Sequence, residues 1–311
     1  MLMITSVFKK STPLNYSLVV ILMLFFFLLY QFQDLAWFKS VLLIAQKVFI
    51  FLLLVGTLFV VNFICKKNGL SKDSTYTVFF FLLYLLFFPS LFDNLKIVAA
   101  NVFLLLALRR LLSLQSLKAS KEKIFDAALW ILVASIFQPW CILFIALVFI
   151  SVLFHVSSDY RNWFLPFIAL LAVAIGFLVF LTFENTTVEE FWLNKLYVDP
   201  TLNYFTNNYQ NWAFSIFMTT ALFFLIIMLL SYSNKPQLLH SSYKKLIAFF
   251  VIAIVVFFIS PDKNNDVLLF AFAPLAIMGT NALEVFQQQL KQELILGILI
   301  VCSLFTFFSQ L

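Results

Sequence analysis

The sequence predicts an all-α fold, a polytopic bundle of transmembrane helices that forms a single domain over residues 1–311. Hydrophobic residues make up 64% of the chain and charged residues 11%, whereas charged residues make up roughly 25% of a soluble protein. Apolar runs recur along nearly the whole length, which leaves no room for a second, soluble domain. The net charge of +6 lies in short clusters between these runs, so it indicates membrane orientation rather than nucleic-acid binding.

Eleven hydrophobic segments are predicted to span the membrane, because about 20 apolar residues cross a bilayer and shorter runs suffice where neighbours cover them. Their approximate limits are 14–32, 41–64, 75–92, 95–112, 124–138, 139–156, 163–183, 212–232, 246–260, 267–286 and 293–310. The first segment follows Lys9 and Lys10 but has no small-residue cleavage site after it. We therefore expect an uncleaved first helix rather than a signal peptide.

The hydrophilic segment from Arg109 to Lys123 orients the predicted bundle. It contains one acidic residue, Glu122, and five basic residues, which are Arg109, Arg110, Lys118, Lys121 and Lys123. The positive-inside rule makes this segment a cytoplasmic loop. With eleven spans, the N-terminus then lies inside and the C-terminus outside. Orientation alone accounts for the charge of this loop, so we expect no functional site in it.

Two stretches each have two interpretations. Residues 124–156 form either a helical hairpin with an outer turn at Pro139 or one long helix that is kinked at this proline. Residues 33–47 either lie in the membrane interface or are followed directly by a span that begins at Val41, with Lys47 extending outward to water.

The longest hydrophilic connection, residues 184–212, is predicted to form a short lid on the outer face. It is too polar to span the membrane, yet it is rich in aromatic residues. Aromatic and amide side chains alternate in it, among them Phe191, Trp192, Asn203, Tyr204, Asn207, Tyr209 and Trp212. This composition suits a re-entrant or interfacial segment.

The sequence assigns no cofactor and no metal site, although Asp262, Asn264, Asn265 and Asp266 of the PDKNND turn could supply oxygen ligands to a hard cation. The three cysteines are far apart and are expected to be packing residues. The five glycines form no phosphate-binding pattern. Most ionisable residues close to the apolar segments, Asp93 and Asp266 included, are expected to be solvated at helix ends. No series of buried acids crosses a span, which argues against a coupled transporter.

Parts of the chain resemble known membrane proteins. An outer turn with Asp93, a short span that ends in Arg109-Arg110, a basic loop and a hairpin with Gln138-Pro139 at its crest resemble the middle of GT-C glycosyltransferases, which use lipid-phosphosugars. The turn PDKNND, followed by VLLFAFAPLAIMGTNALE, is similar to the last third of those enzymes. The whole chain, with KKSTPLNY and RRLLSLQSLKASKEKIFDAALWILVASIF, looks more like a family of uncharacterised bacterial polytopic membrane proteins, which brings no activity with it.

The GT-C resemblance implies a site on the outer face for a polyprenyl-phosphate sugar. Asp34, the only acid of the first outer loop, would act as general base. The residues that would bind substrate are Lys39, Lys47 and Lys96 for the phosphate and Asn203, Tyr204, Asn207 and Tyr209 for the sugar. The chain departs from the GT-C pattern in its short first outer loop and in lacking the usual paired acids.

Whether the protein is an enzyme is left open. The resemblance implies a multi-pass protein of the bacterial inner membrane that is either a glycosyltransferase or a degenerate, non-catalytic relative of one. The alternative hypothesis is a membrane scaffold or assembly factor that binds another membrane protein, and a transporter is the third. In every case the lipid bilayer is the expected partner.

Overall fold

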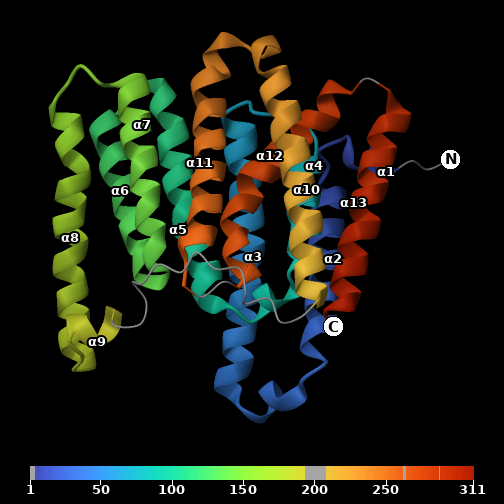
Figure 1. Cartoon of the computed structure of the whole chain (residues 1–311), viewed down its shortest axis with the longest axis horizontal. Helices are drawn as coiled ribbons and strands as arrows, with labels where there is room; N and C mark the ends of the chain where they lie inside the picture. Colours follow the sequence, from blue (N-terminus) through green and yellow to red (C-terminus); the bar gives the residue numbers. More distant parts are fainter. Residues whose placement is uncertain (1–3, 193–207, 262–263, 287) are drawn as a thin grey trace.

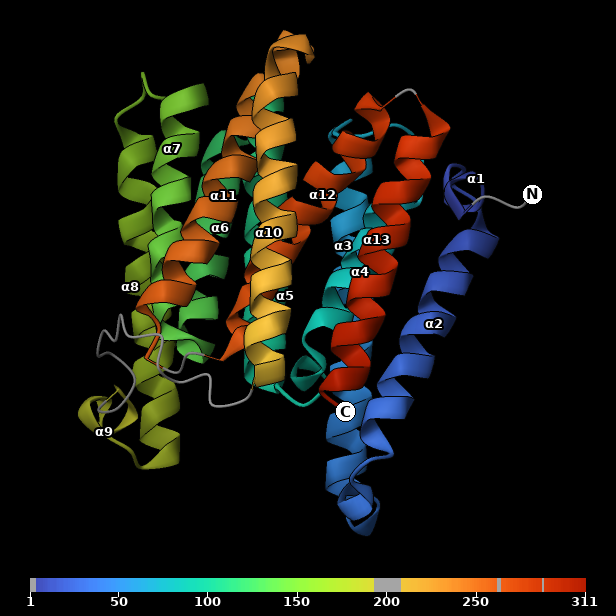
Figure 2. The same ribbon diagram turned by 45° about the vertical axis from the view of Figure 1, so that its right-hand side comes forward.

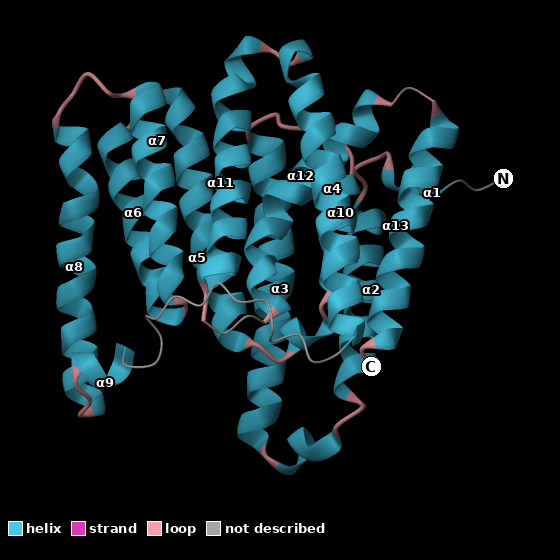
Figure 3. Cartoon of the chain, viewed as in Figure 1, coloured by secondary structure: helices cyan, strands magenta, loops and turns pink. Residues whose placement is uncertain are grey.

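The computed structural model describes residues 4–192, 208–261, 264–286 and 288–311, and all regular structure in these ranges is helical (Figure 3). The all-α prediction is therefore confirmed. The α-helices are α1 (Ile4–Phe8), α2 (Pro13–Gln31), α3 (Val41–Lys67), α4 (Tyr76–Phe87), α5 (Leu95–Leu112), α6 (Ser120–Phe137), α7 (Ile145–His155), α8 (Arg161–Glu184), α9 (Val188–Trp192), α10 (Asn208–Ser231), α11 (His240–Ile259), α12 (Leu269–Val285) and α13 (Gln289–Ser309).

The number of spans differs from the prediction. Each of the eleven apolar segments contains a helix, but within the described residues only eight helices are long and apolar enough to cross a membrane. These eight are α2, α3, α5, α8, α10, α11, α12 and α13, extended in some cases by adjoining 3₁₀ turns. The protein is thus a multi-pass membrane protein by helix length and hydropathy, with about eight full spans rather than eleven.

The helices in the other three apolar segments, α4, α6 and α7, fail to be full spans for identifiable reasons. Helix α4 has 12 residues, about 18 Å at 1.5 Å per residue, because the chain turns into a 3₁₀ helix at Pro89. Helix α7 follows a similar 3₁₀ turn, η4 (Pro139–Phe144). Helix α6 has 18 residues, but its first two turns carry the charged residues Lys121, Glu122, Lys123 and Asp126. The length of an apolar run in the sequence therefore does not give the length of the apolar helix that forms within it.

The helices run alternately between two ends of the bundle (Figures 1 and 2). We call one end the basic end. It carries the connections α5–α6, α7–α8 and α10–α11, and a hydrogen bond of 2.5 Å from Gln115 Nε2 to the carbonyl oxygen of Leu238 joins two of them. The other, distal end carries the 3₁₀ turns η1 (Leu35–Lys39) and η4, together with the C-terminus.

Both open interpretations of the sequence have an answer in the structure. Helices α6 and α7 are separate and packed against one another, with η4 between them, so residues 124–156 form a hairpin. Helix α3 begins at Val41, directly after η1, and Lys47 lies in its second turn.

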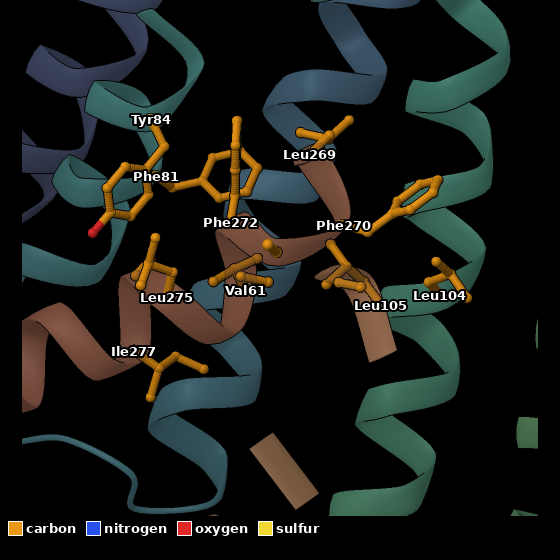
Figure 4. Packing of buried hydrophobic residues seen from close by; sticks show 14 of the residues in the cluster. Val61, Phe81, Tyr84, Leu104, Leu105, Leu269, Phe270, Phe272, Leu275 and Ile277 are labelled. Carbon is orange, nitrogen blue, oxygen red and sulfur yellow. The ribbon is translucent and has the colours of Figure 1, made fainter. Parts of the chain in front are cut away.

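The centre of the bundle consists of α4 and α12. Every residue of α4 is buried, and so is every residue of α12 from Leu269 to Leu283. Figure 4 shows Phe81 and Tyr84 of α4 beside Phe272 of α12, and the ring centroids lie 6.1 and 5.8 Å from that of Phe272. A helix that is apolar on all sides is expected in such a position, because it has no face that needs water.

Gly279 lets α12 approach α4 closely. A Cβ atom at this position would lie 3.2 to 3.3 Å from three atoms of the Phe80 ring, which is itself fully buried. A larger side chain would have to displace this ring or separate the two helices.

Gly279→Leu is therefore expected to destabilise the folded protein by about 1–3 kcal/mol, the usual cost of overpacking a core. Thermal unfolding in detergent measures the effect. Gly56→Leu in α3 is the matched control, because a Cβ there meets nothing within 4 Å. Equal melting temperatures for the two variants would contradict the close approach of α4 and α12.

Candidate functional site

A cavity of about 780 Å³ lies between α5, α6, α8 and α9. Its walls are aliphatic and aromatic, and one residue of the lining carries a charge. The lining residues are Lys96, Phe103, Leu129, Val133, Ile136, Phe137, Ala172, Val173, Gly176, Phe177, Phe180 and Phe191. Such a volume and composition are typical of small-molecule sites, in which a few polar groups orient an apolar ligand.

Lys96 is the charged residue of this cavity, and it lies in the first turn of α5 at the distal end. The helix begins at this point because the side chain of Asn94 caps it, accepting a hydrogen bond of 3.2 Å from the backbone N–H of Ile97. Lys96 is exposed, so its ammonium group can meet an anion that approaches from water.

Helix α9 closes part of the cavity. Its first turn is a capping box, in which the backbone N–H of Thr187 donates to Glu190 and the backbone N–H of Glu190 donates to Thr187 Oγ1, at 2.9 and 3.2 Å. The hydrogen bond from Thr187 lowers the pKa of Glu190. The rings of Phe191 and Trp192 then lie 5.0 and 5.8 Å from that of Phe177 in α8. The start of the predicted lid is thus packed against the cavity wall.

A polar network links α2, α3 and α5 at the distal end. Asp93, just before α5, accepts hydrogen bonds from Lys47 of α3 and from Gln31 Nε2 of α2, the latter at 2.7 Å. The carbonyl oxygen of Gln31 in turn accepts a hydrogen bond of 2.9 Å from Trp37 Nε1 in η1. The Asp93 side chain is 46% exposed, so it remains accessible to water.

Asp266, in the 3₁₀ turn η7 (Asn265–Leu268), is the buried acid of the distal end, with 1% exposure. Its carboxylate accepts hydrogen bonds from Ser90 Oγ, from Asn94 Nδ2 at 2.7 Å and from Asn264 Nδ2 at 3.1 Å. The prediction that Asp266 is solvated at a helix end is therefore wrong. The residues PDKNND would be equally typical of a turn exposed to water. Asp266 is buried only because other segments of the chain pack against this turn.

The predicted site residues do not come together in one place. Lys96 lines the cavity, whereas Lys47 pairs with Asp93. Asp34 and Lys39 are exposed at and beside η1, on the α2–α3 hairpin, which Figures 1 and 2 place far from α8 and α9. Tyr209 is 52% exposed in the first turn of α10. Asn203, Tyr204 and Asn207 lie outside the described residues, and the roles proposed for all these residues stay predictions.

Because Asp266 is buried and Asp93 is half exposed, their removal is expected to have different costs. Asp266→Ala leaves three donors without an acceptor and should lower the free energy of unfolding by about 3 kcal/mol or more. Asp93→Ala removes a partly solvated pair and should cost about 1 kcal/mol or less. Chemical unfolding of both variants in the same detergent measures the difference. A larger loss in the Asp93 variant would disprove the buried role of Asp266.

Comparison with known proteins adds a family but no activity. No curated protein and no solved structure matches the chain. The pattern of one family, described as "Family of unknown function (DUF6427)", matches residues 4–311. This match agrees with the predicted membership of a family of uncharacterised membrane proteins, and it lends no support to the GT-C resemblance. Since nearly the whole chain is covered, the protein belongs to the DUF6427 family.

Proposed function

We propose that this membrane protein binds a lipid-linked anionic substrate at the distal end of the bundle. The hydrocarbon chain of the substrate would lie in the cavity between α5, α6 and α8, and its phosphate would meet Lys96. The observation that carries this proposal is the lining of the cavity, which is apolar and aromatic apart from one lysine at the distal end of α5. A single cation beside a long apolar cavity is complementary to a single phosphate on a long apolar chain.

The position of α8 gives such a substrate a path of entry. This helix lies at the edge of the bundle (Figure 1), and only four of its 24 residues, Asn162, Pro166, Ala169 and Leu181, are buried within the protein. One side of α8 therefore faces the hydrocarbon of the membrane while another side lines the cavity. A lipid chain can therefore pass from the bilayer into the cavity without crossing water. If the cavity opened only to water, the chain would have to leave the membrane first.

The finer proposal is that the bound lipid phosphate carries a sugar which the protein transfers, as the GT-C resemblance implies. Asp34 on the α2–α3 hairpin would act as general base, and Tyr209 would belong to the sugar site. Asp93 competes with Asp34 for this role, because it lies three positions before Lys96 in the chain and is partly exposed. The cavity supports lipid binding directly and supports transfer only through that binding.

Two variants test the cavity. Lys96→Gln removes the charge and is expected to weaken binding of a polyprenyl phosphate at least about tenfold, since a hydrogen bond to a charged group contributes about 1.5–3 kcal/mol and each 1.4 kcal/mol is tenfold. Gly176→Phe is expected to weaken it similarly by filling the space, because a Cβ at Gly176 meets nothing within 4 Å. Native mass spectrometry of the purified protein with added polyprenyl phosphate measures the bound fraction.

Two control variants carry the same kinds of substitution, Lys to Gln and Gly to Phe, at positions outside the cavity. Lys118→Gln removes one positive charge at the basic end, and Gly297→Phe adds a ring to α13, where a Cβ also meets nothing within 4 Å. Both control variants should bind as the unchanged protein does. If Lys96→Gln and Gly176→Phe also bind normally, the cavity is not the lipid site.

Sugar transfer is tested separately from binding. Asp34→Asn is expected to abolish transfer to an outer-surface glycan while polyprenyl-phosphate binding and membrane insertion are retained, because Asn has the shape of Asp but cannot accept the proton. Radiolabelled sugar transfer in membrane vesicles provides the measurement. Asp93→Asn is assayed in parallel, and loss of transfer in this variant alone would assign the base to Asp93 instead.

A further inference from the structure

A second cavity, of about 670 Å³, lies at the basic end, where the α5–α6 connection meets the segment before α11. It involves four separate parts of the chain, the ends of α3 and α5, the first turn of α6 and the 3₁₀ turn η6 (Gln237–Leu239). Its lining residues are Lys67, Asn68, Arg109, Arg110, Leu112, Ser113, Gln115, Ser116, Lys123, Pro236, Leu238 and Leu239. Membrane orientation explains the sign of the four charges, but it does not explain why they surround a cavity.

Most of the positive charge in this cavity has no counter-charge. Arg110 pairs with Asp126, with Nη2 and Oδ2 2.9 Å apart. Among the residues that the structure describes, no carboxylate lies within 4 Å of the cationic groups of Lys67, Arg109 or Lys123. Concentrating cations in this way is electrostatically unfavourable unless an anion joins them.

Cations next to the cavity are arranged differently. Lys66 pairs with Asp73 at 2.7 Å, and Lys121 pairs with Asp159 at 3.2 Å. Acids are therefore present at the basic end, and of the three ion pairs that the described residues form there, only Arg110–Asp126 involves a cation of the cavity.

Two of the cavity cations share one aromatic ring. Lys67 Nζ and the guanidinium carbon of Arg109 lie 5.1 and 4.8 Å from the centre of the Phe63 ring. This contact holds both cations near the same ring without occupying their N–H donors, because a ring face attracts the cation as a whole. Both groups thus keep hydrogen-bond donors for a ligand.

The backbone beside the cavity is strained and firmly held. Leu117 and Ala119, in the α5–α6 turn, have φ values of 55° and 49°, a left-handed conformation that is unfavourable for residues other than glycine. Lys123 Nζ holds the turn by donating to the carbonyl oxygen of Ser113 and to Ser116 Oγ, at 2.8 and 2.7 Å. Strain that the surroundings maintain in this way is concentrated at ligand sites.

We propose that this basic cavity binds a phosphate group, which is presented either by the headgroup of an anionic phospholipid or by a soluble phosphorylated molecule. Arg109 offers the planar pair of donors that matches phosphate oxygens, and Lys67, Arg110 and Lys123 add charge. Exposed apolar side chains at the rim, among them Leu238 at 79% exposure and Phe63 at 42%, favour the lipid source, because acyl chains would cover them. Basic pockets between helix ends are a recurrent site for lipid headgroups.

The test compares two double variants of the whole protein that lose the same charge. Lys67→Gln with Arg109→Gln removes cavity cations, and Lys118→Gln with Lys121→Gln removes cations of the same end that do not line the cavity. In nanodiscs of phosphatidylcholine that contain some phosphatidylglycerol, native mass spectrometry measures the enrichment of retained phosphatidylglycerol. The cavity variant should lose about 30-fold in this enrichment, since each basic residue near an anionic lipid contributes about 1 kcal/mol, while the control variant should stay within a few-fold of the unchanged protein.

A soluble ligand is distinguished by a second measurement. Glycerol 1-phosphate is titrated into the protein in a neutral detergent, and calorimetry reports binding for the same two variants. If the cavity variant loses phosphatidylglycerol binding, the site takes a lipid headgroup. If it loses glycerol 1-phosphate binding, the site takes a soluble phosphate. Either result supports the proposal.

The single variant Arg109→Lys guards against a loss caused by misfolding. It keeps the charge but loses the planar donor pair, and it is expected to show an intermediate loss with an unchanged melting temperature. The proposal is overturned if the cavity and control variants lose binding equally, which indicates non-specific charge, or if neither loses binding of either probe.

Discussion

The packing of α12 against α4 is the interaction on which the rest of the structure depends. Helix α4, at about 18 Å, is too short to cross a hydrocarbon core of about 30 Å, and in lipid its ends would leave backbone groups without partners. It is stable only because other helices surround it. The contact of Gly279 with Phe80 and the aromatic rings packed around Phe272 bring this central pair together, and the seven other long helices can then shield it from lipid.

Helix α5 connects the two candidate sites. Its first turn supplies Lys96 to the distal cavity, and its last turn supplies Arg109 and Arg110 to the basic one. Between these ends its buried residues pack against α3, α6 and α12. The protein thus offers a cation beside an apolar cavity at one end and a group of cations at the other, along a single rigid element. Under the two proposals made above, anionic ligands bind at opposite ends of this helix.

Much of the fold could be predicted from the sequence, because apolar runs and prolines act locally. The runs located eleven of the thirteen α-helices in the described residues, all but α1 and α9, and Pro139 marked the turn between α6 and α7. The number of full spans could not be predicted in the same way. The apolar run around α4 continues past its end, and only the structure reveals that the chain leaves the helix before Pro89.

The candidate site was less accessible to sequence reasoning, because it depends on residues far apart in the chain. Lys96 was identified as a lone cation on the outer face, but nothing local indicates that Phe177 and Phe180 of α8 complete its cavity. The basic cavity was missed for a similar reason, since Phe63 and Leu238 come from distant segments. The Asn203 and Tyr204 predictions concern residues outside those described, so they remain as the sequence left them.

The unequal lengths of the helices have a consequence for the membrane itself. Helix α3, with 27 residues, extends for about 40 Å, whereas the spanning helix α2, with 19 residues, extends for about 28 Å. A bilayer that matches α2 is too thin for α3, so α3 must tilt, extend beyond the hydrocarbon, or thicken the lipid around it. The α2–α3 hairpin is therefore a part of the protein whose fit depends on the thickness of the membrane.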